Sequence, residues 1–208
     1  MLYIKTVESG TLSLLNKLME VPTLQKFSLV GGTALALRYG HRSSIDLDLF
    51  SHEKFDHTRI ESELKIEFGD NFVFESGHKN IGIFCNIQRI KVDIVYYPHP
   101  PIAEVVVEDK IRMYSSADIS AMKIQAILGR AKKKDFWDLF ELLQHYSLQE
   151  MIDWHKQKYP SQMLAISIPN AISYFVEAEE SETPVSFKGQ TWDGIKKGIS
   201  RKVSDYLR

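Results

Sequence analysis

The spacing of hydrophobic residues changes along the chain, from a mixture of helix and strand patterns to helical patterns alone. Up to about residue 112, short apolar runs alternate with segments whose apolar residues recur at helical spacing. The predicted helices in this part cover residues 9–20, 32–39 and 55–68. The predicted strands are residues 27–31, a run that carries Asp46 and Asp48, and residues 72–75, 81–87, 90–97 and 104–107.

The polar pairs Lys79-Asn80 and Gln88-Arg89 separate the third, fourth and fifth strands, which predicts an antiparallel meander. After Ser116, a good N-cap residue, the pattern becomes helical. Helices are expected over residues 117–129, 134–146, 147–159 and 163–180, and a final helix after a loop at 181–190. The expected fold is α+β (α/β), a mixed sheet flanked by helices, with a sheet-bearing part (1–112) and a helical part (113–208).

The composition excludes some classes of function. Of the 208 residues, 44% are hydrophobic and 25% are charged, which is ordinary for a globular protein. The formal net charge of -1 lacks the basic character of a dedicated nucleic-acid binder, so contact with nucleic acid would need a local patch. The single cysteine, Cys85, cannot form an internal disulfide, and no signal peptide or membrane-spanning stretch is visible. A cytoplasmic protein without membrane association is therefore expected.

Gly31, Gly32 and Thr33 lie where a predicted strand passes into a predicted helix. Free N–H groups and the positive end of the helix dipole make such a junction suitable for phosphate. Glycine also lets a ligand approach the backbone closely. The alternative is a tight turn in which Thr33 is the N-cap.

Asp46 and Asp48 alternate with aliphatic residues, so the two carboxylates share one face of the predicted strand. Aspartate is depleted in strands, which indicates a special role. Magnesium prefers carboxylate and phosphate oxygens, and two carboxylates on one face can hold one or two ions that bind nucleotide phosphates. The alternative is the solvent-facing side of an edge strand.

Asp93 is another aspartate within an apolar strand, and it faces away from Val92 and Ile94. If its strand neighbours that of Asp46 and Asp48, the three form a carboxylate triad. Asp93 would then be a metal ligand or the general base toward an acceptor hydroxyl. An exposed strand position is the alternative.

Charged residues gather around the junction of the next two predicted helices. Lys123 lies within an apolar stripe, where a lysine either extends to solvent along its stem or serves an internal anionic site. Arg130 and residues 132–134 form either an ordinary solvated surface or a local patch for phosphate or RNA. Asp135 and Asp138 fall in the first turns of the following helix, where carboxylates interact favourably with the helix dipole.

The chain resembles the AbiEii-type nucleotidyltransferases, a branch of the DNA polymerase β-like nucleotidyltransferase superfamily. The shared motifs are Gly31-Gly32-Thr33, Asp46-x-Asp48, Asp93, Lys123 and Lys134-Asp135-Phe136-Trp137-Asp138-Leu139, with a similar tail segment at Thr191-Trp192-Asp193-Gly194-Ile195-Lys196. The motif-bearing part covers about residues 27–140. Many members are toxins of toxin–antitoxin or abortive-infection systems. The superfamily usually has Gly-Ser where this chain has Gly32-Thr33, and threonine keeps the hydroxyl.

The resemblance implies a nucleotidyltransferase-like fold, with a helical part that completes the active site, and it implies roles for individual residues. The nucleotide-binding residues would be Gly31, Gly32, Thr33, Arg42 and Lys123, the last on the triphosphate. The metal ligands would be Asp46, Asp48 and Asp93. The catalytic residues would be these three aspartates together with Lys123 and Asp135.

The resulting hypothesis is a magnesium-dependent nucleotidyltransferase that moves a nucleoside monophosphate from a nucleoside triphosphate (NTP) to an acceptor hydroxyl. The implied cofactor is one or two Mg²⁺ ions, and the implied partners are an acceptor, either RNA such as tRNA or a protein, and a cognate antitoxin. Two alternatives stay open. One is a non-catalytic nucleotide-binding or complex-forming module, and the other is kinase-like phosphoryl transfer by the same metal site.

Overall fold

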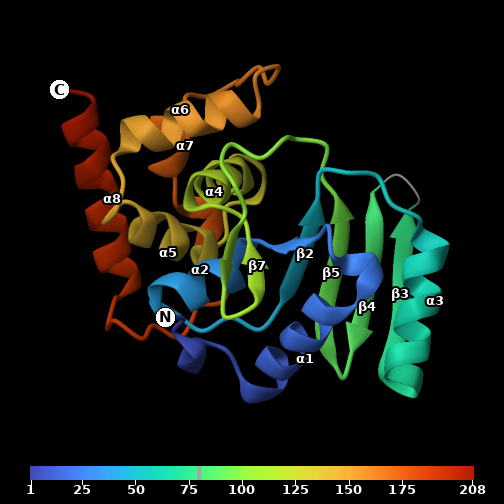
Figure 1. Cartoon of the computed structure of the whole chain (residues 1–208). Coiled ribbons are helices and arrows are strands. Elements are labelled where there is room, and N and C mark those ends of the chain that lie inside the picture. The colour runs from blue at the N-terminus through green and yellow to red at the C-terminus, as the bar shows by residue number, and fades with distance from the viewer. Residues whose placement is uncertain (79–80) are drawn as a thin grey trace.

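The computed structural model describes residues 1–78 and 81–208, and its strands form one seven-stranded sheet (Figure 1). The strands are β1 (Ser28–Leu29), β2 (Leu47–Ser51), β3 (Phe72–His78), β4 (Gly82–Ile87), β5 (Ile90–Tyr96), β6 (Val106–Glu108) and β7 (Ile111–Met113). Their order across the sheet is β3-β4-β5-β2-β1-β7-β6.

The sheet contains parallel and antiparallel pairs, so it is mixed, as predicted. β3, β4 and β5 pair antiparallel in chain order, which confirms the meander. The polar pair Lys79-Asn80, expected in its first turn, lies outside the described residues. β2 runs parallel to β5 and antiparallel to β1, and β1 runs parallel to β7.

Two strand predictions need correction. Asp46 lies just before β2 rather than inside it, because regular pairing begins at Leu47. Ile111–Met113 forms a strand that the hydrophobic pattern does not indicate, since three residues are too few to show an alternation. The predicted boundary between residues 112 and 113 falls inside this strand, and the division into two parts stays a prediction.

The helices surround the sheet and make up most of the second half of the chain. The α-helices are α1 (Ser9–Glu20), α2 (Gly31–Tyr39), α3 (His57–Phe68), α4 (Ser116–Arg130), α5 (Lys133–Leu142), α6 (Leu148–Lys158), α7 (Ile168–Ile172) and α8 (Trp192–Tyr206). Single 3₁₀ turns occur at Ile4–Thr6, Pro22–Leu24, Gly69–Asn71 and Val176–Ala178. None of the described helices is both long and apolar enough to cross a membrane.

The helix predicted at residues 163–180 is wrong for most of its length. Only Ile168–Ile172 is α-helical, and it begins after Ser167, whose side chain accepts a hydrogen bond from the N–H of Asn170. The preceding segment cannot continue into this helix, because Pro169 lies in its first turn and lacks a backbone N–H. Met163 is 97% exposed, so no buried face stabilises a longer helix there.

Two helix ends also differ from the prediction. The N-cap of α4 is Ser115 rather than Ser116, because the Ser115 side chain accepts a hydrogen bond from the N–H of Asp118. The helix predicted at residues 134–146 ends at Leu142 and continues as turns.

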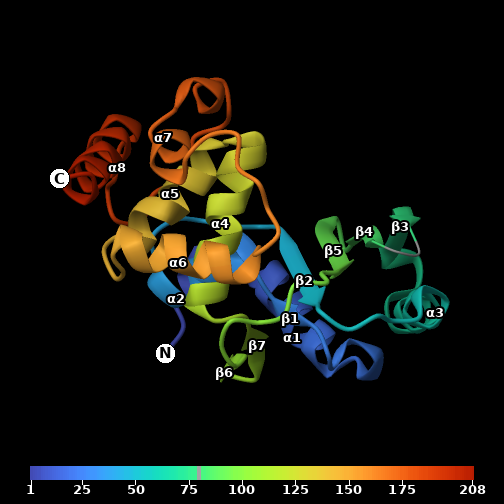
Figure 2. The ribbon, with the colours of Figure 1, turned by 90° about the horizontal axis from the view of Figure 1, so that it is seen from above.

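The two central strands divide their side chains between a buried and an accessible face. Leu47 and Leu49 of β2 and Val92 of β5 are fully buried, whereas the side chains of Asp48 and Asp93 lie on the opposite face of the sheet. Figure 2 shows α1 and α3 along one side of the sheet and the helices from α4 onward gathered on the other. The carboxylates therefore face the region between the sheet and the helical part.

Replacing Leu64 on the buried side of α3 should destabilise the fold strongly. Leu64→Ala removes a fully buried side chain and is expected to lower the free energy of unfolding by about 2–5 kcal/mol in urea titrations. Ile66→Ala is the matched control, because Ile66 lies on the same helix but is 85% exposed. Equal losses in the two variants would contradict this packing.

Candidate active site

The junction between β1 and α2 forms an open helix end. Gly31 has a φ of +69°, a left-handed conformation that other residues rarely adopt. Val30 occupies the N-cap position, and in the described part of the chain no side chain caps the first N–H groups of α2. Such an open, positively polarised end can receive an anion.

Thr33 is not the N-cap of α2, so that interpretation is wrong. Its buried hydroxyl lies 2.9 Å from Oγ of Ser44 and donates a hydrogen bond to the main-chain carbonyl of Asp46. Thr33 therefore joins α2 to the segment before β2 and positions Asp46.

Asp48 of β2 and Asp93 of β5 are register partners, which confirms that their strands are neighbours. Asp46 stands two residues before Asp48 and adds its charge to the same environment. A Cβ added at Gly31 would lie 2.8 Å from Oδ2 of Asp48, so only glycine allows the helix end to approach this carboxylate. The three aspartates thus lie together beside the open end of α2.

The three aspartates together carry more negative charge than the nearby basic side chains balance. Burial and the charge of Asp93 raise the pKa of Asp48 to about 6. Oδ2 of Asp93 accepts a hydrogen bond from Lys91 at 2.9 Å, but its buried Oδ1 has no hydrogen-bond partner among the described residues. Nζ of Lys134 lies 3.4 Å from Oδ2 of Asp46.

These donors suit a hard cation such as Mg²⁺, which prefers carboxylate oxygens. Within residues 1–78 and 81–208, no three His, Cys, Asp or Glu side chains converge closely enough to form a metal cluster as they stand. The unpaired oxygen of Asp93 and the raised pKa of Asp48 still indicate a site whose charge a cation would balance.

Asp138 of α5 is a buried carboxylate that three basic side chains surround. Its Oδ1 accepts a hydrogen bond from Nε of Arg42 at 2.7 Å and lies 2.8 Å from Nε2 of His41. Its Oδ2 accepts from Nη2 of Arg42 at 2.8 Å and lies 2.7 Å from Nζ of Lys123. Burial alone would raise the pKa of Asp138, but Arg42 and Lys123 hold it well below its usual range.

The bidentate contact with Asp138 also places Arg42 at the open end of α2. The guanidinium lies against Gly32, where an added Cβ would collide with Nη2. A positive group therefore stands beside the free N–H groups of the helix. This is a position from which Arg42 can meet a phosphate.

Lys123 serves an internal anionic site rather than extending to solvent. Its Nζ donates to Oδ1 of Asp135 at 2.9 Å and also contacts Asp138. Burial would lower the pKa of Lys123, but these two aspartates raise it above its ordinary value, so the side chain stays charged. The expected contact of Lys123 with a triphosphate stays a prediction.

The side chains of the predicted basic patch, Arg130 and residues 132–134, do not all point toward the carboxylates. Arg130 and Lys134 border the carboxylates, and Nε of Arg130 lies 3.6 Å from Oδ2 of Asp135. Lys133 points elsewhere, because its Nζ donates to the carbonyl of Glu179 at 2.8 Å. The basic surface near the site is therefore smaller than the run of lysines suggests.

A cavity of about 430 Å³ connects most of these groups. The predicted site residues that line it are Gly31, Gly32, Arg42, Asp46, Asp48, Asp93 and Lys123. Thr33 and Asp135 do not line it; they hold residues that do. The sequence reasoning missed Ser44, Phe50, Phe84 and Gln125 in the lining.

The sequence pattern also does not indicate the anchoring roles of His41 and Asp138. An aspartate between buried aromatic and aliphatic residues of an amphipathic helix is the signal that could have found Asp138. His41 has no comparable local signal.

A family model described as "Nucleotidyl transferase AbiEii toxin, Type IV TA system" matches residues 13–205. The chain belongs to this AbiEii nucleotidyl transferase toxin family. The match confirms the resemblance seen in the motifs and extends beyond residues 27–140. The chain is also 30% identical over 199 residues to an uncharacterized protein of Aquifex aeolicus (strain VF5), which covers 93% of this chain and 94% of that protein.

Two solved structures have folds similar to that of this AbiEii chain. A protein of H. pylori that is provisionally described as a nucleotidyltransferase has a TM-score of 0.58 at 19% identity, over 97% of this chain and 99% of its own. The nucleotidyltransferase toxin MenT4 of Mycobacterium tuberculosis H37Rv has a TM-score of 0.56 at 14% identity, over 95% of this chain and 86% of its own. These similarities confirm the predicted nucleotidyltransferase-like α+β fold.

Removing the charge of Asp138 should destabilise the AbiEii chain. Asp138→Asn leaves buried Arg42 and Lys123 without their shared anion, so we expect a loss of about 3–5 kcal/mol in urea unfolding. Asp153→Asn makes the same chemical change at a side chain that is 57% exposed, and should stay within about 0.5 kcal/mol of the wild type. A small loss of unfolding free energy in Asp138→Asn would show that the contacts of Asp138 with Arg42 and Lys123 do not stabilise the fold.

Stability should fall as the pH rises through the range in which Asp48 ionises. Its pKa lies at about 6 in the folded protein and at 3.8 ordinarily, so between these values the folded state keeps a proton that the unfolded chain releases. The loss in the free energy of unfolding should approach about 3 kcal/mol above pH 6, measured in buffer with a chelator.

Asp48→Asn should remove this pH dependence and be more stable than the wild type at about pH 8, with the difference vanishing toward about pH 4. Urea unfolding at both pH values measures it. Asp70→Asn, a change at an exposed aspartate, should keep the wild-type slope. Identical slopes for Asp48→Asn and the wild type would refute the assignment.

Proposed function

We propose that this AbiEii chain is a magnesium-dependent enzyme that transfers a nucleoside monophosphate from an NTP to an acceptor hydroxyl. The observation that carries the proposal is the pairing of Asp48 with Asp93 on one face of the sheet, with Asp46 beside them. The same cavity contains the open amino end of α2. Family membership supports the same class of reaction.

The residues of the cavity divide into those for phosphate and those for metal. The N–H groups at Gly31 and Gly32, with Arg42, would receive the phosphates. Asp46, Asp48 and Asp93 would hold one or two Mg²⁺ ions, which when bound supply charge neutralisation for the transferred group. Lys123 would add positive charge to the triphosphate, and Asp135 would hold Lys123 in place.

In this reaction the acceptor oxygen forms a bond to the α-phosphorus. The bond from that phosphorus to the oxygen shared with the β-phosphate breaks, and pyrophosphate leaves with the electron pair. The proton of the acceptor hydroxyl passes to a carboxylate. Asp93 is the proposed base where it does not serve as the third metal ligand, because its buried Oδ1 has no hydrogen-bond partner among the described residues.

The acceptor that we propose is an RNA such as tRNA, and a protein hydroxyl is the alternative. Arg130 and Lys134 at the cavity provide a local basic surface, which favours a polyanion and predicts binding that weakens with salt. Because the family model describes a type IV toxin–antitoxin system, we also propose a cognate antitoxin. Action in the cytoplasm, where NTPs are available, completes the proposal.

Nucleotidyl transfer can be measured with radiolabelled NTPs, Mg²⁺ and total tRNA. Label at the α-phosphate should appear on the acceptor, and label at the γ-phosphate should appear in pyrophosphate. Asp48→Asn should lower transfer at least about a hundredfold, because it removes charge where the metals and phosphates meet. A chelator should abolish transfer and added Mg²⁺ restore it, whereas Asp70→Asn should transfer like the wild type.

The other outcomes identify the alternatives. Transfer of the γ-label to the acceptor would indicate kinase-like chemistry. Nucleotide binding in calorimetry without any transfer would indicate a non-catalytic module. Equal transfer by Asp48→Asn and the wild type would rule out the proposed metal site.

A further inference from the structure

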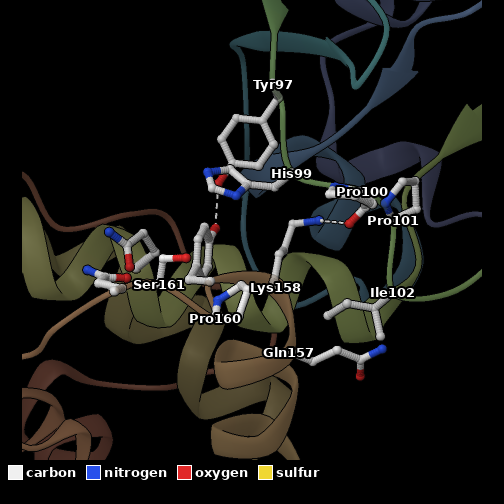
Figure 3. Close-up of a pocket in the computed structure, with 12 residues that line it drawn as sticks. Tyr97, His99, Pro100, Pro101, Ile102, Gln157, Lys158, Pro160 and Ser161 are labelled. Atoms are coloured by element: carbon white, nitrogen blue, oxygen red, sulfur yellow. Dashed lines mark hydrogen bonds between the residues drawn. The ribbon is translucent and has the colours of Figure 1, made fainter.

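A second cavity, of about 770 Å³, adjoins the one that contains the carboxylates. It lies between the segment after β5, the middle of α4 and the end of α6 (Figure 3). Its volume is within the range of small-molecule sites. The proposed reaction assigns no role to it, although it is larger than the cavity beside Asp48.

The two cavities adjoin each other, because Tyr97 and Gln125 line both. Asp93, Val95 and Tyr97 alternate along one face of the chain through β5, and Asp93 and Val95 line the first cavity. Tyr97 lies four residue steps after Asp93 along an extended chain, which is roughly 13 Å. A ligand with phosphates at the carboxylates and a flat group farther along the cleft would reach the second cavity.

One wall of the second cavity is aromatic. The rings of Tyr97 and His99 lie together in Figure 3, with centroids 4.9 Å apart, and the ring of Tyr159 lies 4.8 Å from that of His99. The hydroxyls of Tyr97 and Tyr159 are joined by a hydrogen bond. Burial and the nearby charge of Lys158 lower the pKa of His99, so its ring is neutral at physiological pH.

The wall is held rigidly and offers no free cation. Lys158 is the sole lysine or arginine of the lining among the described residues. Its Nζ is fully buried, contacts Oδ1 of Asp118 at 2.7 Å and donates to the carbonyl of Pro100 at 3.2 Å. Asp118 also accepts from the N–H of Ile102 at 2.8 Å, so the loop after β5 is fixed to α4 and α6.

Amide side chains supply the remaining polar groups. Oε1 of Gln125 lies 2.9 Å from Nε2 of His155, a ring whose pKa burial lowers to about 4. The neutral imidazole donates this bond to Oε1, and within the described residues the side chain of Gln125 makes no other hydrogen bond. Gln157 and Gln162 add further donors and acceptors at the rim.

We propose that this second cavity is a nucleobase subsite in which His99 and Tyr97 form the stacking surface and Gln125 meets the base edge. Aromatic rings with amide groups and no available charge suit a flat, polar-edged, uncharged ring better than a phosphate. The proposal rests on the proposed function, and the base belongs either to the NTP or to an RNA acceptor.

The test measures nucleoside binding without metal or turnover. The full-length chain is titrated with adenosine, guanosine, cytidine and uridine, which carry no phosphate, and binding is followed by NMR. His99→Ala should weaken binding about tenfold, because stacking is lost. His99→Phe keeps a ring and should retain most of the affinity, and His52→Ala, at an exposed histidine outside the lining, should bind like the wild type.

Transfer kinetics then identify the source of the base. A higher KM for the NTP in His99→Ala assigns the subsite to the donor, and a higher KM for tRNA alone assigns it to the acceptor. Wild-type affinity in His99→Ala, equal weakening in His99→Phe, or no nucleoside binding by the wild type would each overturn the inference. Nucleoside binding that depends on the ring at position 99, without any nucleotidyl transfer, would instead contradict only the proposed function.

Discussion

The buried carboxylate of Asp138 is the contact on which the rest of the site depends. Arg42 and His41 reach it from the turn after α2, and Lys123 reaches it from α4. Because buried charges are tolerated only when they are paired, each of these groups needs the others. The guanidinium of Arg42 lies against Gly32, so the same pairing sets the charge at the open end of α2. Stability and the proposed phosphate affinity therefore share one interaction.

Asp48 and Asp93 show the opposite arrangement. Asp138 is surrounded by basic groups, whereas Asp93 has an oxygen without a hydrogen bond in the described part of the chain and the pKa of Asp48 is raised to about 6. Unbalanced buried charge costs stability, and a bound cation would remove that cost. The basic partners of Asp138 therefore distinguish it from Asp48 and Asp93. The sequence motifs that contain these aspartates do not show this difference.

Elements that local interactions determine could be predicted from the sequence. The helix Ser9–Glu20 and the antiparallel meander follow from residue spacing and turn residues, and both agree with the structure. The helix expected at 163–180 fails because helical spacing there does not coincide with a buried face. The contact between Arg42 and Asp138 joins residues 96 positions apart, so no local pattern contains it.

The alternation along β5 explains how one strand can serve both cavities without disturbing the core. Val92 and Ile94 fill the buried face and contribute to stability, so the opposite face is free to vary in chemistry along its length. That face passes from the carboxylate of Asp93 to the ring of Tyr97 over a distance that the extended backbone keeps constant. Because the strand is paired on both sides with β4 and β2, this spacing is rigid. A rigid separation between the proposed phosphate and nucleobase sites favours ligands of matching length and disfavours shorter ones.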